Sequence, residues 1–69
     1  MKKISDLRKN NENMSQRELA DAISVTQASI SRWEKNQLSI SGANLIKLAT
    51  FFKVSTDELL GIEDQLKTN

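Results

Sequence analysis

The chain has 69 residues and a formal net charge of +1, and it contains neither cysteine nor histidine. A single domain of this size buries only about 60% of its unfolded surface, which excludes a deep substrate cavity. Disulfides and thiolate metal sites are impossible without cysteine. Histidine, the commonest general base and zinc ligand, is also missing. We therefore expect no enzyme, no metal and no cofactor.

No segment predicts contact with a membrane. The apolar runs fall far short of the roughly 20 residues that span a bilayer. The start of the chain, MKKISDLRKN, also lacks the apolar core of a signal peptide. We therefore expect a soluble, cytoplasmic protein.

The charge is unevenly distributed along the chain. Residues 1–54 contain nine Lys or Arg against five acidic residues, whereas residues 55–69 contain four acidic residues against one Lys. An acidic end of this kind is usually a solvated segment without a specific role. A nucleic-acid partner is compatible with the basic body if its charge is focused on one face.

Four helix starts carry the same pattern, in which an apolar residue precedes Ser or Thr and another follows four positions after the hydroxyl. In this pattern the hydroxyl caps the first turn while the two apolar residues pack across it. The four sets are Met14-Ser15-Leu19, Val25-Thr26-Ile30, Ile40-Ser41-Leu45 and Val54-Ser55-Leu59. Ser15 and Ser55 are also followed by Glu at the third helical position, which completes a capping box.

Apolar residues recur with helical spacing throughout the chain, and no segment alternates as a strand would. The pattern predicts five helices, near residues 2–11, 16–23, 27–36, 42–52 and 56–61. We expect an all-α, compact five-helix bundle that forms a single domain over residues 1–69. Its core spans about residues 3–61, and residues 62–69 form an acidic, frayed tail.

The second and third predicted helices are joined by a very short connection that ends at the cap Thr26. Two short helices joined in this way cross steeply. Val25, Ile30 and Trp33 then face the core, which fixes the outer side of the third helix. That outer side carries Gln27, Ala28, Ser31 and Arg32, with Lys35 one turn further on.

These residues carry a resemblance to a known family. Gln16, Ala20, Val25, Ile30 and Trp33 at their spacings, with the segments ISRWEKN and LIKLATFFKVSTDELLG, make the chain similar to the phage-repressor (lambda-repressor and Cro-like, XRE-type) helix-turn-helix proteins. The resemblance runs from about residue 4 to residue 61. It implies a five-helix lambda-repressor-like domain that binds double-stranded DNA sequence-specifically and regulates transcription on the nucleoid of a bacterial or phage-infected cell.

The chain departs from the family pattern in its turns. Ser24 stands where the turn between the two helices usually has Gly, and Asn36 replaces another common Gly. We expect both to be tolerated, Asn36 more readily because Asn enters the left-handed region at lower cost. The turn before Met14 is one residue longer than usual, and Ile40 takes the place of a frequent Pro.

The resemblance assigns base contacts to the third helix. Gln27 would enter the major groove, where its amide matches N7 and N6 of an adenine. Thr26 and Ala28 could offer methyl groups to a thymine, and Arg32 could reach a guanine or a phosphate. The alternative for each residue is an ordinary position on a solvated helix.

Phosphate contacts are assigned to the start of the second helix. Gln16 resembles the family residue that grips a backbone phosphate together with the free amides of that helix end. The expected helpers are Ser15, Arg17, Ser31 and Lys35, with simple surface solvation as the alternative for each.

Arg8 and Glu34 receive a structural role, because in relatives an Arg of the first helix and the Glu after the Trp form a partly buried ion pair. Contact of Arg8 with a phosphate is the alternative. Trp33 is expected in the core. We expect no base-stacking platform for single strands, because the chain has just three aromatic residues.

The predicted function is therefore a transcriptional regulator, with repression favoured. A protein-interaction module on the same fold, such as an antitoxin or anti-repressor, is the alternative, and an exposed apolar patch on the third helix would favour it. We expect a homodimer on a pseudopalindromic operator, formed through Leu60, Ile62 and Leu66, and we expect no small-molecule ligand.

Overall fold

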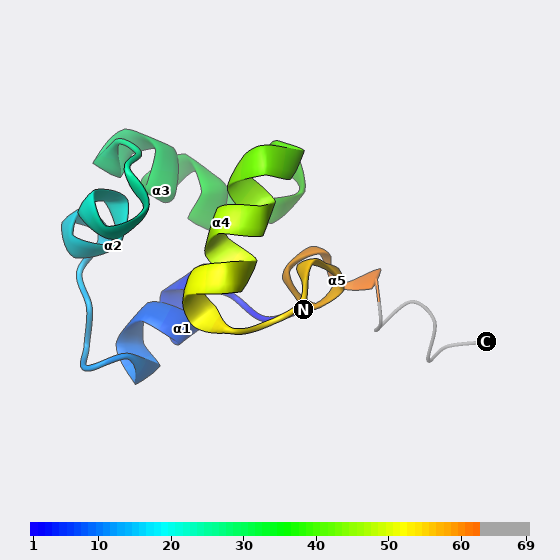
Figure 1. Cartoon of the computed structure of the whole chain (residues 1–69), viewed down its shortest axis with the longest axis horizontal. Helices are drawn as coiled ribbons and strands as arrows, with labels where there is room; N and C mark the ends of the chain where they lie inside the picture. Colours follow the sequence, from blue (N-terminus) through cyan, green and yellow to red (C-terminus); the bar gives the residue numbers. More distant parts are fainter. Residues whose placement is uncertain (63–69) are drawn as a thin grey trace.

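The computed structural model describes residues 1–62, and every regular element in this range is a helix (Figure 1). The helices are α1 (Ile4–Asn10), α2 (Gln16–Ile23), α3 (Gln27–Lys35), α4 (Gly42–Phe52) and α5 (Thr56–Leu60), with a 3-10 turn, η1 (Gln37–Ser39), between α3 and α4. The predicted all-α class is confirmed, and the five predicted helices agree with the structure to within two residues at each end. The sequence did not predict η1.

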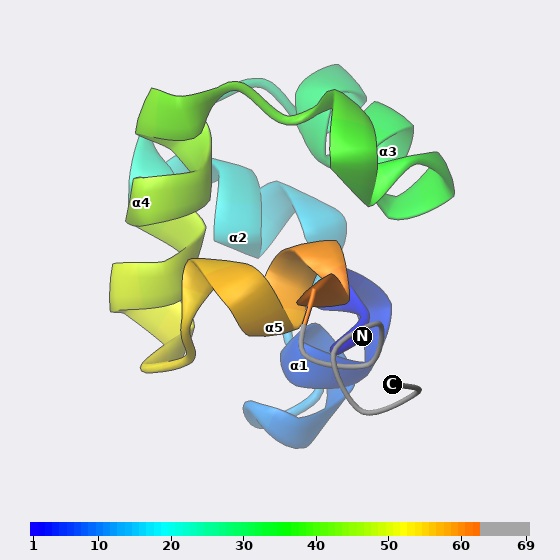
Figure 2. The same ribbon diagram turned by 90° about the vertical axis from the view of Figure 1, so that its right-hand side faces the viewer.

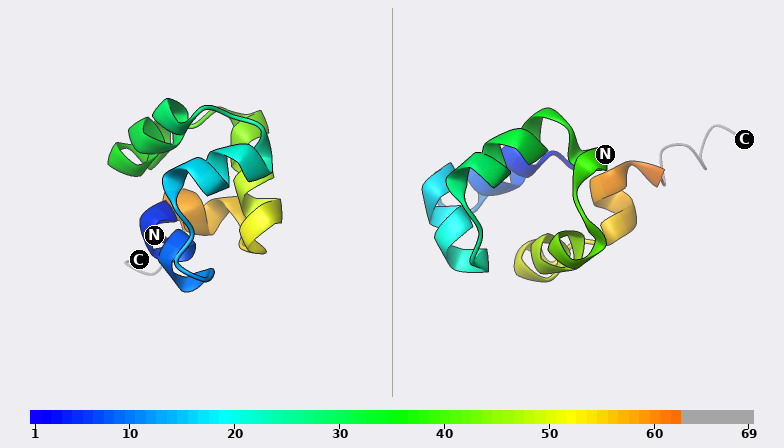
Figure 3. Two further views of the ribbon diagram at one scale, coloured as in Figure 1. Left: turned by 90° about the vertical axis from the view of Figure 1, so that its left-hand side faces the viewer. Right: turned by 90° about the horizontal axis from the view of Figure 1, so that it is seen from above.

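The helices α2 and α3 pack against each other at the end of the molecule opposite α5 (Figures 1 and 3). Helix α4 contacts both α2 and α5 and so connects the two ends. The start of the chain runs beside α5 (Figure 2), where Lys2 N donates to Glu58 O at 2.8 Å. This arrangement leaves one side of α3 uncovered.

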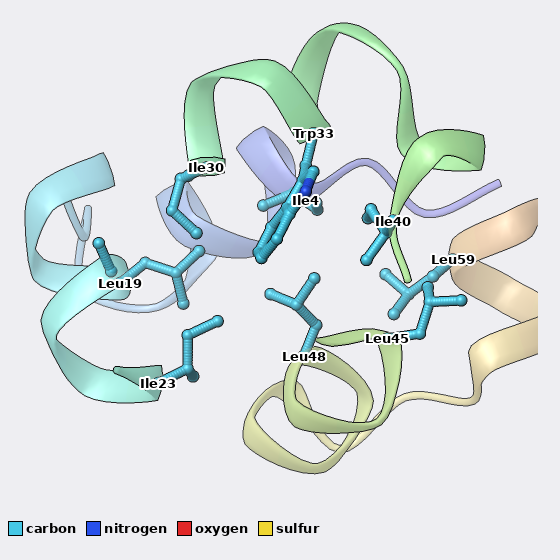
Figure 4. Packing of buried hydrophobic residues seen from close by; sticks show 10 residues of the cluster. Ile4, Leu19, Ile23, Ile30, Trp33, Ile40, Leu45, Leu48 and Leu59 are labelled. Carbon is cyan, nitrogen blue, oxygen red and sulfur yellow. The ribbon is translucent and has the colours of Figure 1, made fainter. Parts of the chain in front are cut away.

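The core lies between α2, α3 and α4 and continues to α5 (Figure 4). Trp33 projects from α3 into its centre and is 4% exposed, and Leu48 of α4 points toward it from the other side. The other buried apolar residues are Ile4, Leu19, Ala20, Ile23, Ile30, Ile40, Leu45 and Leu59. All five helices contribute to this cluster, so the helix pair α2–α3 is held by the whole domain.

Local capping explains where three of the helices begin. Ser15 and Ser55 form complete capping boxes with Glu18 and Glu58, and Thr26 accepts from the backbone of α3. Ser41 occupies the predicted cap position of α4 but makes no side-chain bond to the backbone of that helix. Its Oγ instead accepts from the Asn44 side chain at 3.0 Å.

The connections differ from one another in backbone conformation. Ser24 is left-handed, with φ 61°, which is the conformation that a Gly would adopt most easily. Asn36 was expected to be left-handed, and this expectation is wrong, because its φ is −151°. The reason is η1, since Asn36 caps this turn by accepting from Leu38 N at 3.2 Å in an extended conformation.

Gln37 is the one buried polar residue among those described, and no pattern in the sequence indicates its role. Its Oε1 accepts from Ile4 N at 2.8 Å, while its Nε2 donates to Leu59 O at 2.8 Å and to Lys2 O at 3.0 Å. One side chain from η1 therefore joins the start of the chain to α5. Both polar atoms of its side chain are bonded, as burial requires.

Candidate nucleic-acid interface

The helix α3 has one buried side and one exposed side. Ile30 and Trp33 fix the buried side in the core. The side chains of Gln27, Ala28 and Arg32 are exposed, as the sequence predicted. No large apolar side chain of α3 is exposed, so the uncovered side is polar and cationic.

An open hollow of about 490 Å³ runs along this side, and we call it the α3 hollow. Its lining residues are Ala28, Ser31, Arg32, Lys35, Asn36 and Ser39. Four of these six were predicted as DNA contacts, and the structure brings them together in one place. Asn36 and Ser39 were missed because η1, which carries the second of them, was not predicted.

Thr26 caps α3, as the sequence predicted. Its Oγ1 accepts from Ser29 N at 3.1 Å and lies 2.9 Å from Ser29 Oγ. The hydroxyl is therefore occupied in capping α3, which leaves the methyl group as the part that a base could meet. Neither Thr26 nor Gln27 lines the α3 hollow, and both come before its first lining residue, Ala28, in the sequence.

The first turn of α2 has two kinds of backbone amide. In its capping box, Ser15 N donates to Glu18 Oε1 at 2.9 Å and Glu18 N donates to Ser15 Oγ at 3.0 Å. The two amides between them, those of Gln16 and Arg17, have no acceptor within a helix. Arg17 is exposed and Gln16 is half-buried. The helix start thus offers two N–H donors beside a cation, which suits an anion.

Arg8 and Glu34 form a bidentate ion pair between α1 and α3. Arg8 Nε donates to Glu34 Oε2 at 2.6 Å and Arg8 Nη2 donates to Glu34 Oε1 at 3.1 Å. Arg8 Nη1 also donates to Met14 O at 2.8 Å, just before the cap of α2. Gln16 Nε2 donates to Glu34 Oε1 at 3.1 Å, a contact that the sequence did not predict. The pair therefore joins α1, α2 and α3.

The electrostatics of this group favour the charged forms. Partial burial raises the pKa of Glu34, but hydrogen bonds from Arg8 and Gln16 and the positive charges of Arg8 and Lys9 lower that pKa more, so it lies below its ordinary value. The hydrogen bond to Glu34 raises the pKa of Arg8. Arg8 and Glu34 are accordingly both ionised near neutral pH, and their charges offset each other.

The three residues predicted for a dimer contact differ in how far the structure exposes or describes them. Leu60 is half-buried and packs against the core, so only part of its side chain is available. Ile62 is 37% exposed, and Leu66 lies outside the described residues. Three other apolar side chains are more exposed than Ile62, namely Leu38 in η1 at 68%, Ile46 in α4 at 62% and Met1 at 48%.

In residues 1–62, no group of three or more Asp or Glu side chains is arranged to bind a metal ion. None of the helices in that range has the length and apolarity that crossing a membrane requires.

A family model described as helix-turn-helix matches residues 4–59, from α1 to α5. The chain therefore belongs to the lambda-repressor-type (XRE) helix-turn-helix family, a family of DNA-binding regulatory proteins. Comparison with curated proteins and with solved structures gave no match. Membership identifies α2 and α3 as the helix-turn-helix of a domain that binds double-stranded DNA.

Proposed function

We propose that the protein is a sequence-specific transcriptional repressor that reads the major groove with α3. The observation that carries this proposal is the polar, cationic and uncovered side of α3, whose opposite side is fixed in the core by Ile30 and Trp33. A helix presented in this way fits the major groove, which admits one α-helix. A bound operator that overlaps a promoter would exclude polymerase.

Within this mode of binding, Gln27 makes the main base contact. It is the first residue of α3 and is exposed, and a side-chain amide pairs in a bidentate way with adenine. Arg32, one turn and a half along the helix, lies in the α3 hollow and reaches a guanine or a phosphate. Ala28 and the methyl of Thr26 provide apolar contact for thymine.

The first turn of α2 anchors the protein on a phosphate. The amides of Gln16 and Arg17 and the side chain of Gln16 supply the donors, and Arg17 supplies charge. Ser15 is occupied in the capping box and contributes by shaping the turn. Ser31 and Lys35, which line the α3 hollow, contact further phosphates of the DNA backbone.

Selection of bound sites from random duplex DNA tests this function directly. We expect a short consensus in which each half-site spans one major-groove face, and a reporter placed downstream of it should be silenced by the protein. Enrichment of no sequence above the starting pool would contradict specific binding. Increased reporter expression would retain DNA binding but reject repression.

A protein-interaction module remains the second candidate, and one observation favours it. An open groove of about 440 Å³ lies between the end of α2 and α4, with Ile46 and Phe51 among its lining residues. An exposed apolar patch on α3 would favour the alternative more directly, but no large apolar side chain of α3 is exposed, so this groove is the observation that supports it. Failure of the selection experiment, with capture of a defined protein partner that an Ile46→Asp variant does not bind, would support this alternative.

A further inference from the structure

Gln16 is held by a partner that DNA binding alone does not require. Its Nε2 donates to Glu34 Oε1 at 3.1 Å, although Gln16 begins α2 and Glu34 is near the end of α3. A side-chain amide nitrogen carries two protons. One proton is used on Glu34, which leaves the second for an acceptor outside the protein.

Glu34 is itself held firmly. Its two oxygens accept from Arg8 at 2.6 and 3.1 Å, and Arg8 is anchored in turn on Met14 O at 2.8 Å. The Arg8 and Glu34 side chains are only 12% and 13% exposed. A continuous set of hydrogen bonds therefore runs from the turn before α2, through α1 and α3, to the side chain that begins α2.

This set of hydrogen bonds also reduces the repulsion between Glu34 and a phosphate. A carboxylate close to a phosphate would repel it, but Arg8 offsets the charge of Glu34 through two direct hydrogen bonds. Glu34 can thus accept from Gln16 without adding a net negative charge to the phosphate site.

We propose that Glu34 is a positioning residue, which orders the Gln16 amide before DNA arrives so that its second Nε2 proton meets a backbone phosphate. The inference rests on the proposed function, because it assumes that Gln16 contacts phosphate. Glu34 itself does not touch DNA. Order present before binding improves affinity because less side-chain freedom is lost in the complex.

A double-mutant cycle on a selected duplex tests the proposal, with Glu34→Gln, Gln16→Ala and the double variant measured at a temperature where circular dichroism shows each to be folded. Gln at position 34 replaces one acceptor atom by a donor, so either the bond from Arg8 Nε or the bonds from Arg8 Nη2 and Gln16 are lost. In both cases Gln16 loses its charged acceptor, and a hydrogen bond to a neutral amide holds it less strongly. We expect Glu34→Gln to weaken binding by about threefold or more alone, and by less than about 1.5-fold when position 16 is Ala.

Glu18→Gln is the matched control. It removes one negative charge from the same first turn of α2, and Gln preserves the capping box. We expect this variant to bind as well as the wild type or slightly better, because a charge that repels phosphate is lost. A loss of affinity in Glu34→Gln would then reflect lost positioning and not altered charge.

Relaxation of side-chain amides in the free wild type gives a second measurement that needs no variant. We expect an order parameter above about 0.6 for Gln16 Nε2 and a lower value for Gln27, the exposed residue that begins α3. Equal mobility of the two amides would overturn the proposal.

The remaining outcomes are also decisive. Equal losses from Glu34→Gln in both backgrounds would show that Glu34 does not act through Gln16. A gain in affinity that persists with Ala at position 16 would show that a freed Arg8 binds phosphate directly. Either result would overturn the inference while leaving DNA binding intact. Failure of the wild type to bind any duplex would reject the proposed function and the inference with it.

Discussion

At the scale of single residues, Gln27 carries the specificity in the proposed mode of binding. It is exposed at the start of α3, so Gln27→Ala should leave folding intact. We expect the variant to lose about 1–3 kcal/mol of binding free energy for the selected site and to relax its preference at one base pair.

Gln16→Ala should instead weaken binding to selected and random duplexes alike, since phosphate contacts carry no sequence information. Titrations of both variants on both duplexes would reveal swapped roles.

Ser24 and Asn36 are a matched pair for backbone strain. Ser24 has φ 61° and Asn36 has φ −151°, although the family resemblance predicts a Gly at both positions. Because the left-handed conformation costs an L-residue roughly 1–2 kcal/mol, Ser24→Gly should stabilise the domain by about 0.5–1 kcal/mol. Asn36→Gly relieves no strain and removes the acceptor for Leu38 N, so it should destabilise by about 0.5 kcal/mol or more. Thermal melts that move in the same direction would contradict the assigned conformations.

At the scale of helices, the caps of α4 and α5 differ in what they contribute. The Ser55 hydroxyl accepts from Glu58 N at 3.0 Å, whereas Ser41 makes no bond to the backbone of α4. Ser55→Ala should therefore lower the free energy of unfolding by about 1 kcal/mol. Ser41→Ala should stay within about 0.5 kcal/mol of the wild type. Chemical denaturation of both variants compares the two caps, and equal losses would show that a hydroxyl at this position stabilises without the backbone bond.

How much of each helix could be foreseen depended on the range of the interactions that define it. Ser15, Thr26 and Ser55 mark their helices through bonds within one turn, so the sequence was sufficient for the bounds and for the outer side of α3. Gln37 and the contact between Gln16 and Glu34 depend on segments that meet only in the folded chain, and no local pattern reveals them. Asn36 was wrongly assigned for a related reason, since the unpredicted turn η1 sets its conformation.

At the scale of the whole molecule, the stability of the domain should fall in acid. Hydrogen bonds to the backbone and side chain of Ser15 lower the pKa of Glu18. The pKa of Glu58 is lowered mainly by its hydrogen bond to the backbone of Ser55. The pKa of Glu34 is lowered as well. Each of these pKa values in the folded protein is below the ordinary value of 4.5. The carboxylate's contribution to the free energy of unfolding is therefore complete above pH 4.5, and it is lost as the pH falls through the pKa of the folded state. Melts at neutral pH and at roughly pH 3 should show this loss. Glu58→Gln keeps the box but cannot titrate, so a smaller pH dependence is expected; an unchanged one would exclude Glu58 from the effect.

The assembly on DNA is the other prediction at this scale. Ile62 follows α5 and is 37% exposed, beside the half-buried Leu60. A two-fold contact there would present two α3 helices about 34 Å apart, which corresponds to half-sites roughly 10 base pairs apart in a pseudopalindrome. We expect two chains per selected duplex and weaker binding by Ile62→Asp. Ile46→Asp, at an exposed residue of α4, is the control. One chain per duplex, or equal affinity in Ile62→Asp and the wild type, would exclude this interface.

The hydrogen bonds made by Gln37 should slow the exchange of a backbone amide proton near the start of the chain. Chain ends usually open locally and exchange their amide protons quickly. Here Ile4 N donates to the buried Gln37 Oε1 and Lys2 N donates to Glu58 O, both at 2.8 Å. The Ile4 amide should therefore exchange with deuterium as slowly as those of the core, which would make an amide almost at the chain start a probe of global unfolding.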